Sequence, residues 1–398
     1  MQKPYFSQDE YEHRWVRVHA EMEDRGLDSA LIWSRGGGTY ERFQDVFYLT
    51  NYYSTQSGAA EDILDSYRAA AHCAVLLRRG HEPVLIADDD WWNPELLATD
   101  HIVGSFDVIE TTANLFRDLG ISGAVAMSGS GFLGLKYFQR LQELLPDVEW
   151  NFHDDLVSDV RIIKSDQELE AFREGGETVS RAMNALLSAL HAGKSESEAA
   201  GEAARVVYGN CGQVNLILIH HGPDTAEELT DNPIAGYSSD TPTTGEIARA
   251  WVYGAMFQGY WLDPGRTTVI GRKPSAEQRR LIEACANIVT ALMDAIRPGV
   301  HIGEICAIGD RMREEFGGVE DQMSHRWPLY GHGNGLFWDP PFISHLYSGK
   351  HKVFKKNMVA STETFLALPG IGGAGFEQNF IVTDDGVELL TTTPMLEW

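Results

Sequence analysis

The sequence predicts two domains, an α/β domain followed by an α+β domain that contains an internal duplication. Three observations support this fold class. The 398 residues of the chain exceed the roughly 100–200 residues of one typical domain. In residues 1–158, apolar segments of strand length alternate with segments of helical periodicity, as in α/β domains. In residues 159–398, the order helix, helix, strands occurs twice at an offset of about 110 residues, which indicates a duplication.

The first domain is predicted to begin with a helix. Ser7 and Glu10 have the spacing of a capping box, apolar residues follow at helical intervals, and Gly26 ends the pattern. The later segments alternate between short apolar runs and amphipathic stretches. They predict a strand at 27–33, the two strands of a β-hairpin at 73–79 and 83–89, a helix at 113–119, a strand at 123–127 and a helix at 133–145.

Two capping boxes mark the two halves of the second domain. Ser165 with Glu168 opens the first half, and Ser275 with Gln278 opens the second. In each half a second helix follows, and then a region of strands and loops. A curved antiparallel sheet backed by helices is the expected architecture. The predicted helices cover 165–190, 197–208, 275–296 and 302–316, and the strand regions cover 214–271 and 332–390.

Charge and composition exclude several classes of function. The chain has 58 acidic and 32 basic residues, a net charge of −26, which disfavours nucleic acid and anionic membranes because both are bound through Lys and Arg. No segment reaches the ~18–20 apolar residues of a membrane span, and no secretory signal is visible. The four cysteines are widely separated and are expected to be free thiols. We therefore expect a cytoplasmic protein that acts on a small molecule.

Two glycine-rich runs do not predict a phosphate site. The run at 35–38 fits no phosphate-binding pattern, and the run at 370–375 matches GxGxxG only in spelling. A dinucleotide-binding motif requires a helix after the glycines, whereas a strand-like segment follows this one. Both runs are interpreted as loops.

Three carboxylates and one histidine are the strongest candidates for a chemical site. Asp263, Glu363 and Glu377 lie in or beside predicted strands, and glycines flank His332. A carboxylate that points inward from a buried strand is unfavourable unless it is paired or binds a metal. Together the four side chains form an oxygen and nitrogen ligand set suited to Mn, Fe, Co or Zn. Taken singly, Asp263 can also be an ion-pair partner of Arg266, and Glu377 a cap at a strand edge.

The order of these motifs resembles the creatinase, prolidase and methionine aminopeptidase superfamily. The matching segments are an entry helix, GY..D..RT, GHGNG, STE and E....VT.DG, at 160–173, 259–267, 331–335, 361–363 and 377–386. The resemblance implies a pita-bread fold with a pseudo-twofold axis for residues 159–398. Residues 1–158, including Asn51 to Ser54, resemble the N-terminal domain of creatinase and prolidase, which implies a homodimer.

The resemblance also implies a metal site with one departure from the family. Asp263, His332, Glu363 and Glu377 match four of the family's five ligands. Val252 occupies the position of the remaining aspartate, which in the family serves a second metal. Valine offers no lone pair, so we expect one divalent ion per subunit (Mn, Fe, Co or Zn). By analogy with the family, Glu363 also acts as a proton shuttle, and His332 belongs to the catalytic set.

Further departures fall on the substrate side of the site. Where the peptidases have a second histidine, this chain has Trp338 or Asp339. The position of the creatinase histidine before Asn-Pro holds Asp231, a candidate general base, and the glutamate that creatinase has before its arginine is Gly265. Adjacent strand residues face opposite ways, so one of His220 and His221 is expected to face the site. The residues expected to act on substrate are therefore Asp231, His220 and His221 in catalysis, and Trp338, Asp339, Tyr253 and Arg266 in binding.

These departures favour a mononuclear metal-dependent hydrolase that cleaves a C–N bond in a small, non-peptide, nitrogen-containing substrate. Three alternatives remain open: an Xaa-Pro aminopeptidase or dipeptidase, a lyase, and a non-catalytic binding protein with the same fold. The inference from fold to reaction is analogy.

Overall fold

The computed structural model describes residues 5–35, 44–54, 69, 71–89, 92–226, 232, 234–317 and 328–396. The chain forms two compact units, residues 1–161 and 162–398. Each unit has its own sheet and its own hydrophobic core. Within the described residues, no helix combines the length and the apolar character that a membrane crossing requires.

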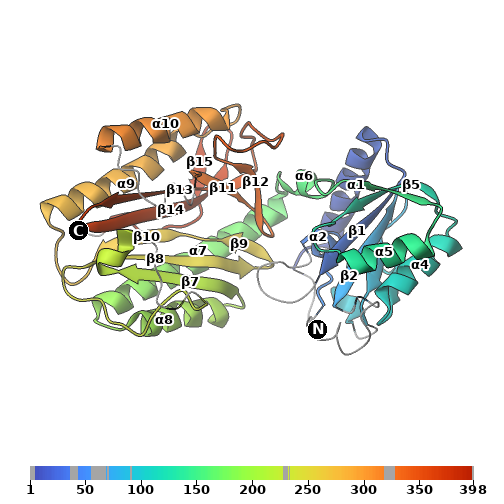
Figure 1. Cartoon of the computed structure of the whole chain (residues 1–398), viewed down its shortest axis with the longest axis horizontal. Coiled ribbons are helices and arrows are strands. Elements are labelled where there is room, and N and C mark those ends of the chain that lie inside the picture. Colours follow the sequence, from blue (N-terminus) through green and yellow to red (C-terminus); the bar gives the residue numbers. More distant parts are fainter. Residues whose placement is uncertain are drawn as a thin grey trace. The chain divides into compact units, whose positions relative to one another are not determined.

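Unit 1 is an α/β domain built on a six-stranded mixed sheet, drawn in blue to green in Figure 1. The strand order is β4-β3-β2-β1-β5-β6, and β1 pairs antiparallel with β2 but parallel with β5. The elements of this unit are α1 (Gln8–Asp24), β1 (Ser29–Arg35), α2 (Gln44–Thr50), β2 (His72–Arg78), β3 (Val84–Ala87), η1 (Pro94–Leu96), β4 (Ile102–Gly104), α4 (Val108–Asp118), β5 (Gly123–Ser128), α5 (Leu135–Leu144), β6 (Val148–Phe152) and α6 (Ser158–Arg161).

The predicted elements of unit 1 are confirmed, with differences at some boundaries. Ser7 Oγ accepts a hydrogen bond from the N–H of Glu10 at the start of α1, as the capping pattern predicts. The predicted hairpin is the antiparallel pair β2–β3. Helix α4 begins earlier than predicted because Asp107 caps it through the N–H of Glu110. The short elements α2, β4, β6 and α6 were not predicted, since so few residues carry little periodic signal.

Unit 2 is built on a nine-stranded antiparallel sheet (Figure 1). Its main order is β12-β11-β13-β14-β10-β8-β7, with β15 paired to β14 and β9 paired to β8. The helices are α7 (Asp166–His191), α8 (Glu196–Gly209), η2 (Gly222–Ala226), α9 (Ala276–Ala295) and α10 (Ile302–Phe316). The strands are β7 (Gln213–His221), β8 (Ile247–Phe257), β9 (Tyr260–Leu262), β10 (Gly265–Val269), β11 (Gly331–Asn334), β12 (Trp338–Phe342), β13 (Val359–Leu368), β14 (Gly372–Val382) and β15 (Val387–Leu389).

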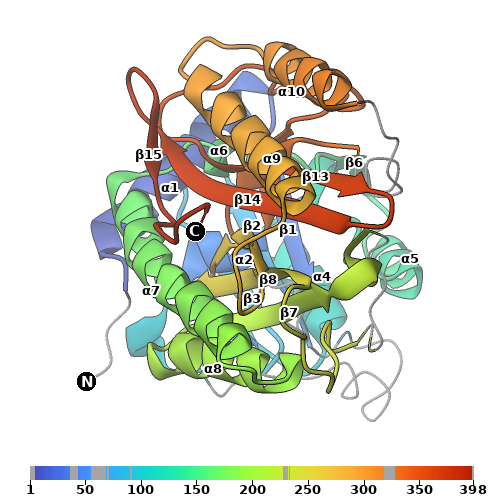
Figure 2. The same ribbon diagram turned by 90° about the vertical axis from the view of Figure 1, so that its left-hand side faces the viewer.

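The internal duplication is visible in the topology. The first half contributes α7, α8 and the strand order β7-β8-β10, and the second contributes α9, α10 and the order β11-β13-β14. The two halves meet at the β10–β14 pair in the middle of the sheet. Figure 2 shows α7 beside α8, and α9 lying along β13 and β14. This is the predicted pita-bread arrangement.

The predicted capping boxes open the long helices of unit 2. Both hydrogen bonds of the box form at Ser165 with Glu168 and at Ser275 with Gln278. Helix α8 begins slightly earlier than predicted because Ser195 and Glu198 form a further box. Each box satisfies N–H groups that a helix start otherwise leaves without partners, which fixes where the helix begins.

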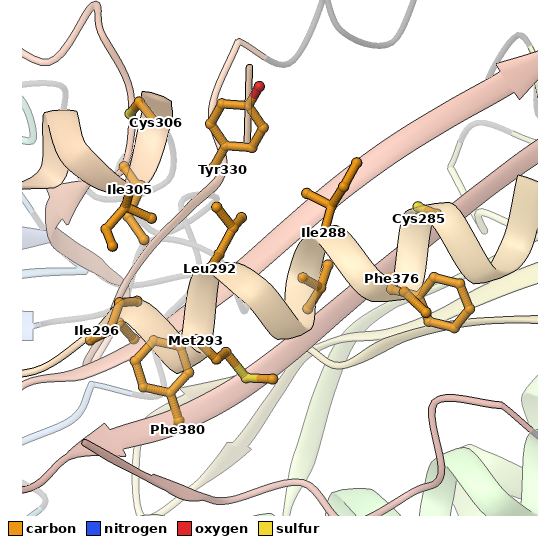
Figure 3. Packing of buried hydrophobic residues seen from close by; sticks show 14 of the residues in the cluster. Cys285, Ile288, Leu292, Met293, Ile296, Ile305, Cys306, Tyr330, Phe376 and Phe380 are labelled. Atoms are coloured by element: carbon orange, nitrogen blue, oxygen red, sulfur yellow. The ribbon is translucent and has the colours of Figure 1, made fainter. Parts of the chain in front are cut away.

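Helix α9 anchors the second half of the sheet through its apolar face. Its side chains Ile288, Leu292 and Met293 are almost fully buried, together with Phe376 and Phe380 of β14 (Figure 3). Burying a side chain of this size stabilises the fold by about 1.5–3 kcal/mol. This packing holds β14 in place from the helical side, while its other face carries the candidate ligands.

The loop interpretation of the glycine run at 370–375 is wrong for most of its residues. Only the first two precede β14, and residues 372–375 lie within that strand. A Cβ atom on Gly373 would lie 2.1 Å from the main-chain oxygen of Thr225. These glycines therefore permit a close approach between backbones, and they do not form a flexible loop.

Candidate metal centre

Three buried groups from three places in the sheet converge on one point. Asp263 lies between β9 and β10, His332 lies in β11, and Glu377 lies in β14. One ligand atom from each residue lies within 4.8 Å of the others. His332 Nε2 is 3.5 Å from Asp263 Oδ2 and 3.5 Å from Glu377 Oε1. The side chains are at most 3% exposed, so the group is shielded from water.

These distances suit a bound metal ion. Ligands about 2.0–2.2 Å from a tetrahedral metal lie roughly 3.3–3.6 Å from one another. Glu377 Oε1 accepts no hydrogen bond from the described residues, which leaves a buried acceptor toward the shared point. Burial and the charges of Asp263 and Glu363 raise the pKa of Glu377 well above its usual range. A divalent cation would offset this repulsion, so the residues present fit the metal that the resemblance implies.

His332 has the protonation and orientation that a metal ligand needs. Its Nδ1 donates a hydrogen bond to the main-chain oxygen of Gly333 at 3.1 Å. That bond leaves the lone pair of Nε2 directed at the two carboxylates. Burial lowers the pKa of His332, which favours the neutral imidazole. A neutral ring with a free Nε2 lone pair is the ligating form of histidine.

Asp263 is held in position by three N–H donors. The side-chain amides of Asn334 and Asn379 donate to Oδ1 at 3.1 and 2.8 Å. The indole N–H of Trp338 donates to Oδ2 at 3.1 Å. Such bonds fix the orientation of a ligating carboxylate.

Glu363 lies directly across from Glu377 in the β13–β14 ladder. Residues paired in this way point to the same face of a sheet, with Cβ atoms about 4.5–5.5 Å apart. Glu363 is 3% exposed, and its charge acts on Glu377. Its carboxylate therefore borders the group formed by Asp263, His332 and Glu377, although it is not one of the three atoms that converge.

Trp251, the residue before Val252, contacts a carboxylate of the centre. Trp251 and Val252 are consecutive residues of β8, so their side chains lie on opposite faces. The indole N–H of Trp251 donates to Glu377 Oε2 at 2.9 Å. Trp251, and not Val252, therefore faces the carboxylates. The alignment of Val252 with the family's aspartate stays a prediction.

The residues expected to bind substrate have other partners in the structure. Trp338 directs its indole at Asp263, and its ring lies 4.6 Å from that of His332. Tyr253 makes an edge-to-face contact with Trp338. Asp339 is buried in an ion pair with Lys164, with 3.3 Å between Oδ2 and Nζ.

Arg266 donates hydrogen bonds to protein oxygens in the strand layer. Its guanidinium bonds the main-chain oxygens of Glu377 at 2.7 Å and of Thr393 at 2.7 Å, and also the side chain of Gln378. The side chain is 1% exposed. Arg266 thus ties β14 to the C-terminal segment and supports Glu377 through its backbone.

The two adjacent histidines lie on opposite faces of β7. His221 Nδ1 is 2.6 Å from Glu196 Oε1 at the start of α8, and this hydrogen bond raises its pKa. His220 pairs across the ladder with Arg249 of β8, two residues from Trp251 and so on the same face as that indole. Both ring nitrogens of His220 lack a hydrogen-bond partner among the described residues. Asp231 lies outside the described residues.

The buried His220 predicts a specific dependence of stability on pH. Burial, with the charges of Arg249 and His221, lowers its pKa from 6.5 to about 3. Between these values the unfolded chain binds one proton more, so stability falls with decreasing pH by up to about 1.4 kcal/mol per unit. We expect His220→Leu to remove this term. Wild type should lose about 2 kcal/mol relative to the variant between about pH 7 and pH 5, measured by urea unfolding.

The exposed His101, changed to leucine, is the matched control for this experiment. It shows what the same change of residue does at an exposed position. A difference between wild type and His220→Leu that does not change with pH would show that His220 is protonated in the folded state as readily as in the unfolded state.

Several residues of the site have little or no local sequence signal. Asn334 stands within the GHGNG motif, and that position could have suggested a partner for a ligand. Trp251, Asn379 and Lys164 carry no such signal, because their roles depend on contacts with residues distant in sequence. Pairing across the sheet, and not spacing along the chain, brings these groups to the centre.

Sequence profiles of two families match the chain. Residues 170–384 match the metallopeptidase family M24, and residues 14–163 match the creatinase/prolidase N-terminal domain. The probable dipeptidase PepE of Mycobacterium tuberculosis is 28% identical over 242 residues, which are 60% of this chain and 61% of that protein. The chain thus spans about three fifths of that relative's length. The Xaa-Pro dipeptidase of Pyrococcus furiosus is 26% identical over 291 residues, 72% of this chain and 77% of that protein.

Solved structures share the fold of the whole chain. The Xaa-Pro dipeptidase from Bacillus anthracis has a TM-score of 0.77 at 21% identity, covering 97% of this chain and 99% of that one. Aminopeptidase P from E. coli, solved with the inhibitor Pro-Leu, has a TM-score of 0.73 at 17% identity, covering 99% and 96%. At these identities the likeness establishes the fold alone.

The comparisons confirm the resemblance derived from the motifs. The M24 profile spans more than half of the chain and includes all four candidate ligands. The chain therefore belongs to the metallopeptidase family M24, and its N-terminal part matches the creatinase/prolidase N-terminal domain.

Proposed function

We propose that the protein hydrolyses the amide bond of dipeptides, including Xaa-Pro dipeptides, with one divalent ion held by Asp263, His332, Glu363 and Glu377. The convergence of three buried ligand atoms at metal-ligand spacing carries this proposal. The dipeptidase names of the relatives support the substrate class. The bound metal would lower the pKa of a water molecule and polarise the substrate carbonyl.

The side chains of the centre have distinct tasks in this proposal. His332 presents the Nε2 lone pair because Gly333 fixes its tautomer. Asp263 is oriented by its three N–H donors. Glu363, the fourth proposed ligand, lies across from Glu377 in the β13–β14 ladder, and in this proposal it also accepts a proton from the attacking water. It then delivers that proton to the amine that leaves.

A non-peptide, nitrogen-containing substrate is the second candidate, and the Trp338 hydrogen bond favours it. The family's second histidine, which serves the peptide carbonyl, is replaced here by a stretch that includes Trp338. The indole N–H of Trp338 donates to Asp263 Oδ2. A donor engaged with a ligand is not available to a peptide carbonyl, so a substrate that does not need this donor suits the centre.

The variant Glu363→Gln tests the proposed proton transfer, because glutamine has nearly the same shape as glutamate but cannot accept the proton. Wild type and variant, both loaded with Mn²⁺, would be assayed with Xaa-Pro dipeptides, other dipeptides and small cyclic amidines and lactams. We expect dipeptide turnover by wild type and a loss of about 100-fold in kcat for the variant, since general acid–base catalysis contributes about 10²–10⁴-fold.

Glu304→Gln, on the surface helix α10, is the matched control and should retain full activity. Turnover of cyclic amidines or lactams without dipeptide turnover would replace the first candidate by the second. An unchanged kcat in Glu363→Gln would remove the proton-transfer role from that residue.

A further inference from the structure

Four N–H donors bond the two carboxylates of the centre. The indole of Trp251 bonds Glu377 Oε2 at 2.9 Å, and the indole of Trp338 bonds Asp263 Oδ2 at 3.1 Å. The amides of Asn334 and Asn379 bond Asp263 Oδ1 at 3.1 and 2.8 Å. We refer to Trp251, Trp338, Asn334 and Asn379 as the donor ring.

The donor ring determines which oxygens remain for a metal. Each carboxylate oxygen has two lone pairs. Asp263 Oδ1 already accepts two hydrogen bonds, and Glu377 Oε2 accepts the indole N–H. The oxygens nearest His332 Nε2 are Asp263 Oδ2 and Glu377 Oε1, each at 3.5 Å. A carboxylate that bridges two ions must give one oxygen to each. Here both lone pairs of Asp263 Oδ1 accept amide N–H groups, and Glu377 Oε2 accepts the indole N–H of Trp251.

The indole of Trp251 also fills the space beside Glu377. A Cβ atom on Gly265 would lie 2.1 Å from the indole, and one on Gly375 would lie 2.5 Å from it. The ring stacks on Phe365 with 5.2 Å between centroids. Strands β10 and β14 therefore carry glycines where the indole lies. A second ion on this side of Glu377 would have to displace a packed, hydrogen-bonded indole.

We propose that Trp251 is the positioning residue that restricts the centre to one metal ion, with the rest of the donor ring holding Asp263. The inference rests on the metal of the proposed function and identifies what sets the metal count. It places the determinant on a hydrogen-bonded indole that faces the centre. The valine that follows it in β8 lies on the opposite face.

Two substitutions test the proposal through metal content. Trp251→Asp replaces a donor by a carboxylate and vacates the space beside Glu377. We expect wild type to hold one ion per chain and Trp251→Asp to hold two, after equilibrium dialysis against Mn²⁺ and elemental mass spectrometry. Trp251→Phe keeps the ring but removes the N–H, so it should still hold one ion, with an affinity about 10–100-fold weaker. Its Co²⁺ absorption spectrum should also shift.

Trp150→Phe, which changes a half-buried indole of unit 1, is the matched control and should equal wild type in metal count and affinity. Two ions in wild type, a single ion in folded Trp251→Asp, or an unchanged affinity in Trp251→Phe would each overturn the inference. If Trp251→Asp does not fold, the wild-type count and the Trp251→Phe affinity decide the question. A metal-free wild type would overturn the proposed function as well, whereas one ion without hydrolysis would overturn only the proposed function.

Discussion

Replacing His332 by alanine should leave a folded chain that no longer binds a divalent ion with useful affinity and no longer hydrolyses its substrate. The imidazole is the only nitrogen ligand in the group of three, and its Nε2 lies 3.5 Å from both carboxylates. Without the imidazole, only the buried carboxylates of Asp263 and Glu377 remain of this group. Losing about 4–5 kcal/mol of transition-state stabilisation corresponds to a fall in kcat/KM on the order of 10³- to 10⁴-fold.

Metal content by elemental mass spectrometry and kcat/KM on the best substrate would both be measured for His332→Ala. His101→Ala changes an exposed histidine of unit 1 and is the matched control. A variant that keeps its ion and loses activity would make His332 a substrate-binding residue. A variant that keeps both would exclude the whole group as the centre.

Local signals account for the parts of the fold that could be predicted. A capping box specifies its own helix start, so Ser165 and Ser275 could be assigned from residues three positions away. The duplication could be predicted because each half repeats the same order of elements. Helix α2 could not, because it has only seven residues and little periodicity.

The residues of the site likewise divide into those that local motifs predict and those that depend on long-range pairing. Asp263, His332 and Glu377 stand in motifs whose residues are close in sequence, and the structure brings these three together. The face of Trp251 depends on the register of β8 against β10 and β7. Register is set by long-range pairing, and a shift of one residue exchanges the two faces of a strand. For this reason the sequence does not indicate that the indole of Trp251 contacts Glu377.

A large loss of stability is expected when the buried ion pair next to Trp338 is broken. Lys164 and Asp339 are 1% and 2% exposed, with 3.3 Å between Nζ and Oδ2. Lys164→Met would leave the carboxylate buried without this cation, and breaking a buried pair by removing one partner costs about 3–5 kcal/mol. We expect a loss of that size in the free energy of unfolding, measured by urea unfolding near neutral pH.

A variant that lacks both charges separates the cost of an unpaired buried carboxylate from the contribution of the ion pair itself. Asp339→Leu combined with Lys164→Met removes both charges, and an apolar replacement of a buried pair is often neutral in stability. The double variant should therefore recover most of what Lys164→Met loses. Asp339 directly follows Trp338 in β12 and pairs with Gly333 of the histidine strand. If the ion pair also positions the Trp338 indole on Asp263, the double variant will regain stability but not the metal affinity of wild type. Recovery of both stability and metal affinity would show that the pair contributes to stability alone.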